Sequence, residues 1–177
     1  KYKYSCINFI LLKMMVENQM KRPMDQLLRD DFYSGLGAWH TTYNPLRVMD
    51  SLQIVPTEND GFVRRQLLRG YVHDEAAAFQ GGVSGNAGLF SNANDLAKVL
   101  QLFLNQGTYG GERYLSLETS RLFTQSKSPT CRRRLGFDKP VMGNPKASPC
   151  GALAPASVYG HTGFTGTCFC VDPDNQL

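Results

Sequence analysis

The end of the chain carries the pattern that most constrains the fold. The stretch from Thr165 to Val171 alternates as a strand does, and Asp172-Pro173-Asp174-Asn175 combines residue types that turns favour. Gly160-His161-Thr162-Gly163 opens this strand-like region, and Gln176 would begin a returning strand. Residues 159–177 therefore predict the first strand and turn of an antiparallel sheet. A hairpin with one arm leaves an unpaired edge, so self-association through that open edge is a further expectation.

The first part of the chain predicts two helices. Residues 5–18 have apolar side chains on nearly every side, which indicates a buried helix, and Ser5 is its expected N-cap. A second helix is expected to begin at Pro23, in a position that proline tolerates, and to run to about Phe32. Gly37 then provides a turn.

Two more helices are expected after a glycine-dense loop at 81–88. The first follows Ser91, its predicted cap, and stops before Gly107. The second spans about 116–123. Residues 41–60 show no regular period, and 126–158 read as a long loop with one short strand near 135–138.

The composition of the 177 residues, 42% apolar and 19% charged, is typical of a soluble globular protein. We expect one partial domain, with a helix- and loop-rich region at 1–158 and a first sheet strand and turn at 159–177. The net charge of +4 is modest. Its densest cluster, Arg132-Arg133-Arg134, has no interleaved aromatic residues and predicts a solvated loop rather than a nucleic-acid contact.

The longest apolar stretch, Ile7 to Val16, is too short to span a bilayer. Glu17-Asn18-Gln19 follow it in place of a small-residue cleavage site, which argues against a signal peptide. The chain begins at Lys1 without an initiator Met, so any export signal is expected upstream.

The five cysteines are an odd number and cannot all pair within one chain. Cys168 and Cys170 alternate on one face of the predicted strand; the others are Cys6, Cys131 and Cys150. This sparse usage favours incidental thiols over a disulfide framework. His161 with Cys168 and Cys170 has a spacing that fits no common metal site, so we expect no metal and no other cofactor.

Two short motifs invite functional readings that their context does not support. Gly82-Val83-Ser84-Gly85-Asn86 differs from the nucleophile elbow G-x-S-x-G at Asn86, so its glycines are expected to serve backbone conformation or close packing. His73-Asp74-Glu75 is expected to make structural hydrogen bonds. No serine in the sequence has a lysine three positions later.

Four phrases occur in a fixed order. They are Tyr4-Ser5-Cys6-Ile7-Asn8-Phe9, Val72-His73-Asp74-Glu75-Ala76, the stretch from Gly81 to Ser91 with Asp95-Leu96-Ala97, and Gly160-His161-Thr162-Gly163-Phe164-Thr165-Gly166-Thr167. Together they resemble the serine beta-lactamase and penicillin-binding-protein superfamily, on its class C and esterase-like side. The resemblance covers essentially the whole chain and begins just after the place where the family's Ser-x-x-Lys helix ends.

The resemblance implies an α+β, beta-lactamase/transpeptidase-like fold, in which an antiparallel sheet with flanking helices packs against a mostly helical region. This chain would supply the mostly helical region and the start of the sheet, an incomplete fold. The family reaction transfers an acyl group to an enzyme serine and then to water.

The resemblance also implies site residues. Tyr4 matches the family's tyrosine base, and His161, Thr162 and Gly163 match its Lys/His-Thr-Gly strand, which anchors and polarises the substrate. His161 is only partly charged near neutral pH, which favours esterase or peptidase-like substrates. Cys6 stands where the family has a substrate-contacting Asn or Asp. The alternatives are that Tyr4 is an ordinary buried tyrosine and that His161 is a turn residue before a strand.

The implied function is a portion of a serine-type acyl hydrolase, inactive without its nucleophile. Its partner would be a small-molecule or peptide acyl substrate, in the periplasm or another extracytoplasmic compartment of a bacterial cell envelope. Fusion to a family 3 glycoside hydrolase domain is a further implication. The alternative is a non-catalytic module that binds peptidoglycan peptides or glycans.

Overall fold

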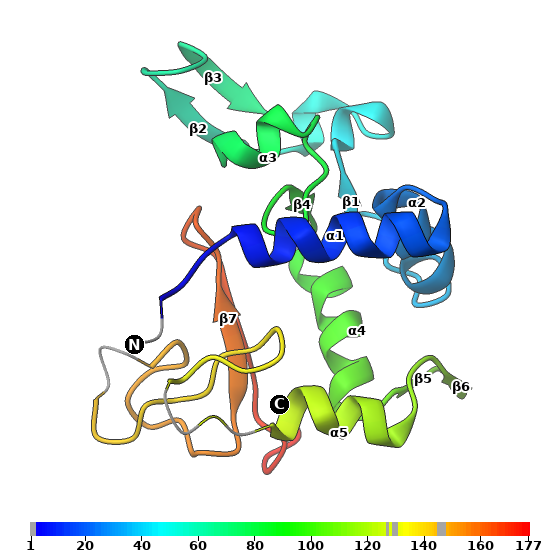
Figure 1. The fold of residues 1–177 in the computed structure, drawn as a ribbon, viewed down its shortest axis with the longest axis vertical. Coiled ribbons are helices and arrows are strands. Elements are labelled where there is room, and N and C mark those ends of the chain that lie inside the picture. Colours follow the sequence, from blue (N-terminus) through cyan, green and yellow to red (C-terminus); the bar gives the residue numbers. More distant parts are fainter. Residues whose placement is uncertain (1–2, 127, 129–130, 145–147) are drawn as a thin grey trace. The chain divides into compact units, whose positions relative to one another are not determined.

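The computed structural model describes residues 3–126, 128, 131–144 and 148–177 (Figure 1). The chain divides into two compact units, one of Tyr4–Ala97 and one of Lys98–Leu177 together with Lys3. Each is described separately below. The division of a single partial domain at residue 158 stays a prediction.

The first unit begins with the two expected helices. α1 spans Ile7–Met20, and α2, Met24–Leu28, continues as a wider turn, η1, over Arg29–Tyr33. Pro23 precedes α2 as predicted, since a residue without an N–H loses nothing there. The chain then turns at Gly37, whose φ of 66° suits glycine.

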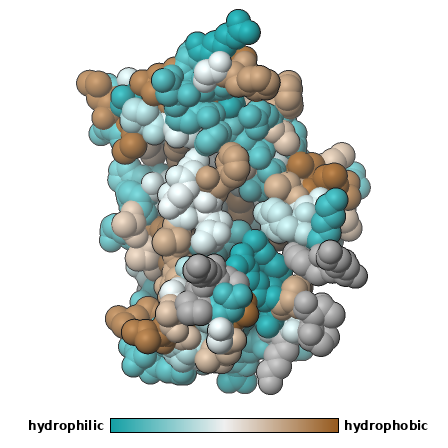
Figure 2. All heavy atoms as spheres, turned by 90° about the vertical axis from the view of Figure 1, so that its left-hand side faces the viewer, coloured by the Kyte–Doolittle hydropathy of each residue, from teal (hydrophilic) through white to brown (hydrophobic). Residues whose placement is uncertain are grey.

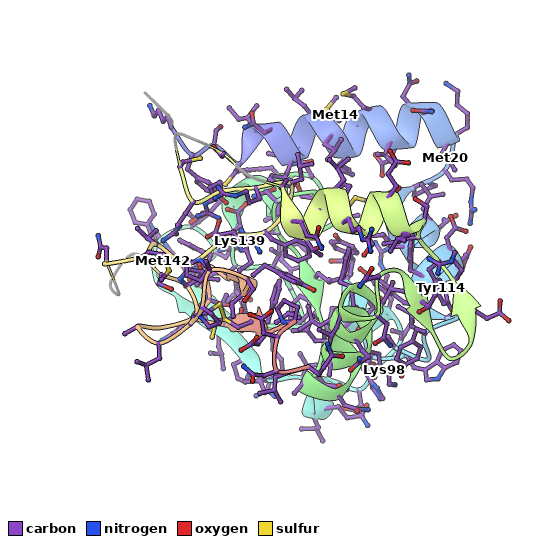
Figure 3. All side chains as sticks on the ribbon, turned by 90° about the horizontal axis from the view of Figure 1, so that it is seen from below. Met14, Met20, Lys98, Tyr114, Lys139 and Met142 are labelled. Atoms are coloured by element: carbon purple, nitrogen blue, oxygen red, sulfur yellow. A yellow bond between two sulfur atoms is a disulfide. The ribbon has the colours of Figure 1, made fainter. Side chains whose placement is uncertain are left out.

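The predicted burial of α1 is wrong: none of its residues is buried. Figure 3 shows Met14 and Met20 on this helix, and their side chains are 56% and 51% exposed. The expected cap is displaced by one residue, because Cys6 occupies the N-cap position while the Ser5 hydroxyl accepts a hydrogen bond from the Ile7 N–H at 3.3 Å.

The glycine-dense loop lies against α1, within the same unit. A Cβ on Gly85 would stand 2.0 Å from the Phe9 carbonyl oxygen, so only glycine allows this approach. Gly82 and Gly88 have φ of 82° and 107°. Ser84 is buried and donates to the Asn86 side-chain oxygen at 2.7 Å. The loop glycines thus serve packing and backbone conformation, as predicted.

Short antiparallel strands occupy the part of the first unit that lacked a clear period. β1, Thr42–Tyr43, pairs with β4, Leu89–Phe90, and β2, Pro56–Asp60, pairs with β3, Gln66–Arg69. Single 3₁₀ turns, η2 over Pro45–Arg47 and η3 over Ser51–Gln53, lie between β1 and β2. The β2–β3 hairpin was not anticipated, because its strands alternate too weakly.

An ion-pair cluster around Arg64 closes the β2–β3 hairpin. Asp60 accepts from the Arg64 Nε at 2.5 Å, and Glu58 accepts from Arg64 Nη2 at 2.7 Å. The bond from Arg64, together with backbone N–H groups of the turn, stabilises the charged carboxylate and holds the pKa of Asp60 well below its ordinary value. His73 joins the cluster through Glu58 at 2.7 Å, and Asp74 caps α3, Glu75–Phe79. The structural role expected of His73-Asp74-Glu75 is therefore confirmed for His73 and for Asp74.

α4, Ala93–Leu104, begins in the first unit and continues into the second. Its cap is Asn92, which accepts from the Asp95 N–H at 2.8 Å, and not Ser91 as predicted. The helix ends before Gly107, which has a φ of 93°. The hairpin of β5, Thr108–Tyr109, and β6, Glu112–Arg113, leads to α5, Leu117–Gln125, capped by Ser116.

The core of the second unit lies beside its last hairpin. β7, Tyr159–Thr162, pairs with β8, Cys168–Val171. The rings of Phe137 and Tyr159 lie 5.0 Å apart between centroids. Leu100, Phe103, Leu104, Phe169 and Val171 complete the cluster. The predicted turn is confirmed, because Asp172 accepts from the N–H groups of Asp174 and Asn175.

Apolar side chains also remain at the surface. Figure 2 shows one face on which hydrophobic side chains lie in separate groups among hydrophilic ones. Among the described residues, the helices are all too short or too polar to cross a bilayer.

Candidate functional site

The candidate site in the second unit is built on β7. Side chains alternate between the two faces of a strand, so Tyr159 and His161 share one face and Gly160 and Thr162 the other. Tyr159 is 2% exposed in the aromatic core, and burial raises the pKa of its phenol to about 12. His161 thus follows, two positions along the same strand, a tyrosine that is buried in the core. It lies inside β7, which excludes the alternative of a turn histidine.

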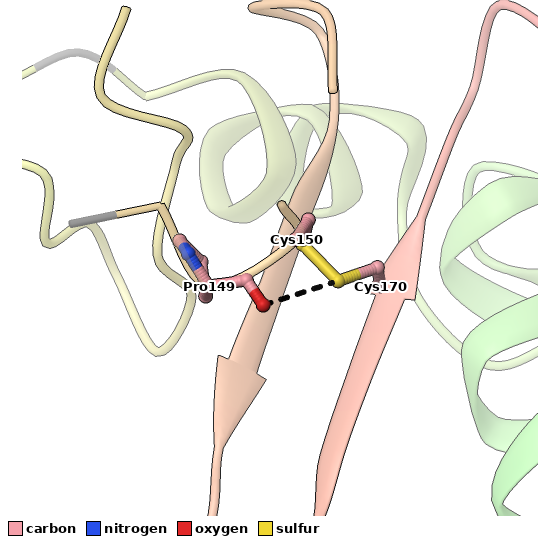
Figure 4. The surroundings of a disulfide bond; sticks show 3 residues. All are labelled: Pro149, Cys150 and Cys170. Carbon is pink, nitrogen blue, oxygen red and sulfur yellow. Dashed lines mark hydrogen bonds between the residues drawn. A yellow bond between two sulfur atoms is a disulfide. The ribbon is translucent and has the colours of Figure 1, made fainter. Parts of the chain in front are cut away.

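A disulfide covers the opposite face of the strand. Cys150 is bonded to Cys170, which pairs with Gly160 across the hairpin (Figure 4). The Pro149 carbonyl oxygen lies 3.9 Å from Cys170 Sγ. A Cβ on Gly160 would stand 2.8 Å from Cys150 Sγ and 2.3 Å from the Phe169 carbonyl oxygen. Gly160 is therefore required by the disulfide and by the neighbouring strand.

This disulfide corrects the expectation of incidental thiols for Cys150 and Cys170. Their sequence separation of 20 residues and different local contexts left no local signal for the pairing. Among the described residues, the structure forms no other disulfide, and Cys6, Cys131 and Cys168 lie outside this one. The described residues contain no group of three or more His, Cys, Asp or Glu side chains placed to hold a metal ion.

A tight turn at 133–138 lies along the other edge of β7. The backbone of Asp138 donates to and accepts from Gly160 at 2.7 and 3.0 Å, and Arg133 forms a bridge with Asp138. The short strand expected near 135–138 is thus reduced to isolated bridges. Gly136, with a φ of 84°, allows the turn.

The arginine cluster is not the solvated loop that the sequence predicted. Asp138 is fully buried, and its two carboxylate oxygens lie 3.0 Å from Arg133 Nε and 3.3 Å from Arg132 Nε. A buried carboxylate requires such partners, because desolvating an unpaired charge is costly. The arginines therefore neutralise a charge inside the unit.

His161 makes two polar contacts through its ring. Nε2 lies 2.8 Å from Arg133 Nη1, and Nδ1 lies 2.7 Å from the carbonyl oxygen of Thr162. Nearby, Lys139 donates to the Ser157 carbonyl at 2.7 Å and lies over the Tyr159 ring. Desolvation lowers the pKa of Lys139. Arg133 thus contacts His161, and Lys139 lies beside Tyr159 at the start of the strand.

Thr162 and Gly163 follow at the end of β7. Thr162 pairs with Cys168 in the ladder, and its side chain is exposed. The Gly163 N–H donates to the Thr167 carbonyl at 2.6 Å and closes the hairpin loop. A Cβ on Gly163 would stand 2.2 Å from the Thr167 hydroxyl oxygen. Glycine therefore keeps this loop narrow beside the exposed Thr162.

Tyr4 and Cys6 lie at the start of α1, in the first unit. The Cys6 Sγ lies 4.0 Å from the Tyr4 hydroxyl oxygen, so the structure brings these two predicted residues together. Tyr4 is 48% exposed, which excludes the alternative of an ordinary buried tyrosine. His161, Thr162 and Gly163 belong to the second unit, and convergence of the two groups stays a prediction.

Sequence reasoning missed Arg133 and Asp138 as neighbours of His161. A signal existed, since a lone acidic residue after the apolar Leu135-Gly136-Phe137 needs a buried cation, and the arginine run stands just before it. Only the pairing of this turn with β7 reveals that the guanidinium reaches the imidazole.

Curated proteins related to this chain are bacterial proteins that share one name. A curated protein of Escherichia coli K12 named "Putative D-alanyl-D-alanine carboxypeptidase" is 39% identical over all of this chain and 43% of its own length. A protein of the same name from Salmonella schwarzengrund is 37% identical, over all of this chain and 44% of its own length. The chain therefore spans less than half the length of these relatives.

Two solved structures share the fold. A penicillin-binding-protein homologue from Caulobacter crescentus superposes with a TM-score of 0.61 and 19% identity, over 93% of this chain and 47% of that one. A protein described as a "putative beta-lactamase" from Bacteroides dorei DSM 17855 reaches 0.64 with 14% identity, over 99% and 47%. The fold is therefore beta-lactamase/transpeptidase-like, with helices and small antiparallel sheets. The sequence model of the Beta-lactamase family matches residues 1–177 in full, and the chain belongs to that family of bacterial hydrolases and penicillin-binding-protein-like enzymes.

Proposed function

We propose that this chain is a portion of a serine acyl hydrolase that cleaves peptide or ester substrates through an acyl-enzyme. The main support for this proposal is the His161-Thr162-Gly163 segment at the end of β7, within a chain that matches the family along its whole length. The carboxypeptidase names of the relatives support a peptide acyl substrate.

In the proposed reaction, a serine from the part of the protein that the relatives have beyond this chain attacks the acyl carbonyl. The Tyr4 phenolate takes the serine proton, the carbonyl carbon bonds to the serine oxygen, and the leaving group departs with that proton. Water then attacks the ester and regenerates the serine. Because an ordinary tyrosine titrates near pH 10, the phenolate requires nearby cations.

The second unit would hold the substrate. Thr162 is exposed at the end of β7, where its hydroxyl can donate to a substrate carboxylate or carbonyl. His161 and Gly163 would shape the same wall of the site. Cys6, 4.0 Å from the Tyr4 hydroxyl, would touch the substrate from the first unit.

We further propose an extracytoplasmic location. The Cys150–Cys170 disulfide supports this, since disulfides persist mainly in oxidising compartments. Fusion to a glycoside hydrolase domain and self-association through a strand edge remain subsidiary proposals. Sedimentation over a wide concentration range tests the latter, and a constant monomer mass would contradict it.

Mass spectrometry with a serine-directed acylating probe tests the catalytic proposal. We expect no adduct on the 177-residue chain and one adduct on a version extended upstream into a Ser-x-x-Lys motif. Tyr4→Phe in the extended version should slow acylation by about 10²–10⁴-fold, the usual contribution of a general base. Tyr114→Phe, a tyrosine of the second unit, is the matched control and should acylate normally.

An adduct on the short chain would contradict the proposal, because the nucleophile would then lie within it. The absence of Ser-x-x-Lys upstream, with retained binding of peptidoglycan peptides or glycans, would instead support the non-catalytic module. The lack of any serine with lysine three positions later in this chain is the observation that keeps this second function open.

A further inference from the structure

Both ring nitrogens of His161 face groups that can play only one hydrogen-bonding role. Nε2 lies 2.8 Å from Arg133 Nη1, and a guanidinium can only donate. Nδ1 lies 2.7 Å from the Thr162 carbonyl oxygen, which can only accept. Nε2 must therefore accept and Nδ1 must carry the hydrogen. These contacts define a neutral imidazole in a single tautomer.

Arg133 is placed beside His161 by an ion pair and by the backbone of the turn that carries it. Its Nε lies 3.0 Å from the buried carboxylate of Asp138. Asp138 in turn pairs through its backbone with Gly160, the residue before His161. Phe137, between Arg133 and Asp138 in the turn, packs into the aromatic core. The guanidinium is therefore anchored to the same strand as the imidazole that it contacts.

The charged groups of this region are mostly cationic. Arg132 and Arg133 both pair with the single carboxylate of Asp138. The Arg133 side chain is 22% exposed. A guanidinium keeps its charge at every physiological pH, in contrast to an imidazole.

We propose that Arg133 is a positioning residue that fixes His161 as the neutral Nδ1–H tautomer and itself carries the positive charge of the His-Thr-Gly strand. The partial charge of histidine then does not limit the attraction of an anionic substrate group, as the sequence alone suggested. The statement about substrate charge rests on the proposed acyl hydrolase function. The tautomer does not.

Nitrogen-15 NMR of histidine-labelled protein tests the tautomer directly, with the resonance assigned by its loss in His161→Gln. At mildly alkaline pH, where a free imidazole is neutral, we expect His161 as Nδ1–H alone. Arg133→Met should convert it to a mixture with the Nε2–H form. Arg133→Lys, which keeps a cationic donor, should restore the single form.

Arg132→Met is the matched control, since it removes the other arginine of the same carboxylate and should leave the His161 tautomer unchanged. The Gly160 and Phe169 amide resonances report whether the hairpin of each variant is folded. An Nε2–H tautomer in the unsubstituted protein would overturn the proposal, whether or not any variant folds. An unchanged tautomer in folded Arg133→Met would also overturn it.

A kinetic comparison tests the charge in the catalytically competent, full-length protein. Arg133→Met should raise KM by at least about tenfold for an ester that carries a carboxylate, the loss expected for one charge-assisted hydrogen bond. A neutral ester of the same acyl group should keep its KM within about twofold. Equal rises for both esters would overturn the charge assignment. The NMR result needs no turnover, so it separates this proposal from a failure of the proposed function.

Discussion

The β7–β8 hairpin and α1 are both rich in apolar residues, yet only the hairpin buries them. Tyr159 and Val171 are each 2% exposed, whereas α1 has no buried residue. In the hairpin, apolar residues alternate on one face and meet aromatic rings from α4 and from the 133–138 turn. The difference teaches that apolar content alone does not bury an element, because burial requires a facing partner.

α1 turns its more polar side chains inward. Lys13 and Glu17 form an ion pair at 3.6 Å with only 13% and 28% of their side chains exposed. Glu17 also accepts from the Met24 N–H that starts α2. By contrast, Met15 and Leu12 are 68% and 50% exposed. The Glu17 carboxylate therefore links α1 to α2, while Leu12 and Met15 are exposed.

The largest expected effect is the loss of Phe137, which contacts the rings of Phe103, Tyr159 and Phe169. Phe137→Ala should lower the free energy of unfolding by about 3–5 kcal/mol, because it opens a cavity in the core. Urea denaturation measures the change. A loss below about 1 kcal/mol would mean that the hairpin is no better packed than α1.

Removal of the Cys150–Cys170 disulfide should have the next largest effect. Cys150→Ser with Cys170→Ser frees a loop closed over 20 residues and should cost about 3 kcal/mol in the free energy of unfolding. Cys168→Ser, an exposed free thiol on the same strand, is the control and should leave stability unchanged. Equal unfolding curves for the double variant and the control would refute a stabilising bond.

Gly160→Ala should cost about 1–3 kcal/mol, since its Cβ would overlap the Phe169 carbonyl and the Cys150 sulfur. Thermal unfolding with and without a reductant distinguishes overlap with the Cys150 sulfur from overlap with the Phe169 carbonyl. If the sulfur supplies most of the overlap, reduction should diminish the penalty. If the strand carbonyl does, the penalty should persist, and no penalty in either condition would contradict the observed packing.

The smallest effect is expected in α1. Met15→Ala should change the free energy of unfolding by no more than about 0.5 kcal/mol, as exposed substitutions usually do. The measurement is the same denaturation used for Phe137→Ala. A loss of 2 kcal/mol or more, by the cost of burying such a side chain, would show that α1 has a partner in solution.

Local sequence signals predicted the elements that depend on nearby residues. The stops at Gly37 and Gly107 and the turn after Asp172 all follow from residue types within one turn of the backbone. The β2–β3 hairpin was not predicted, because its strands lack the alternating apolar residues that are typical of a strand. Arg64, in the turn between the strands, pairs instead with Glu58 and Asp60 of β2. Residues that form ion pairs do not recur at a regular spacing in the sequence, so they give no strand signal.

The candidate site also has one part that the sequence predicted and one part that it did not. The order of the phrases around Tyr4 and His161 indicated the family and its proposed site residues, and the full-length match confirmed the family. The surroundings of His161 were not predicted, since Arg133 and Asp138 reach it only through backbone pairing with Gly160.

The amino-acid sequence by itself indicated four of the helices, several turns and the family, because these depend on short-range propensities and on the order of motifs. It predicted a single strand over 165–171, whereas the structure forms a hairpin from Tyr159–Thr162 and Cys168–Val171. Tertiary structure alone decided which apolar residues are buried, which cysteines pair and which cation meets His161. Those outcomes depend on contacts between residues far apart in the chain, where the free energy of burial and charge pairing is gained only once both partners are in place.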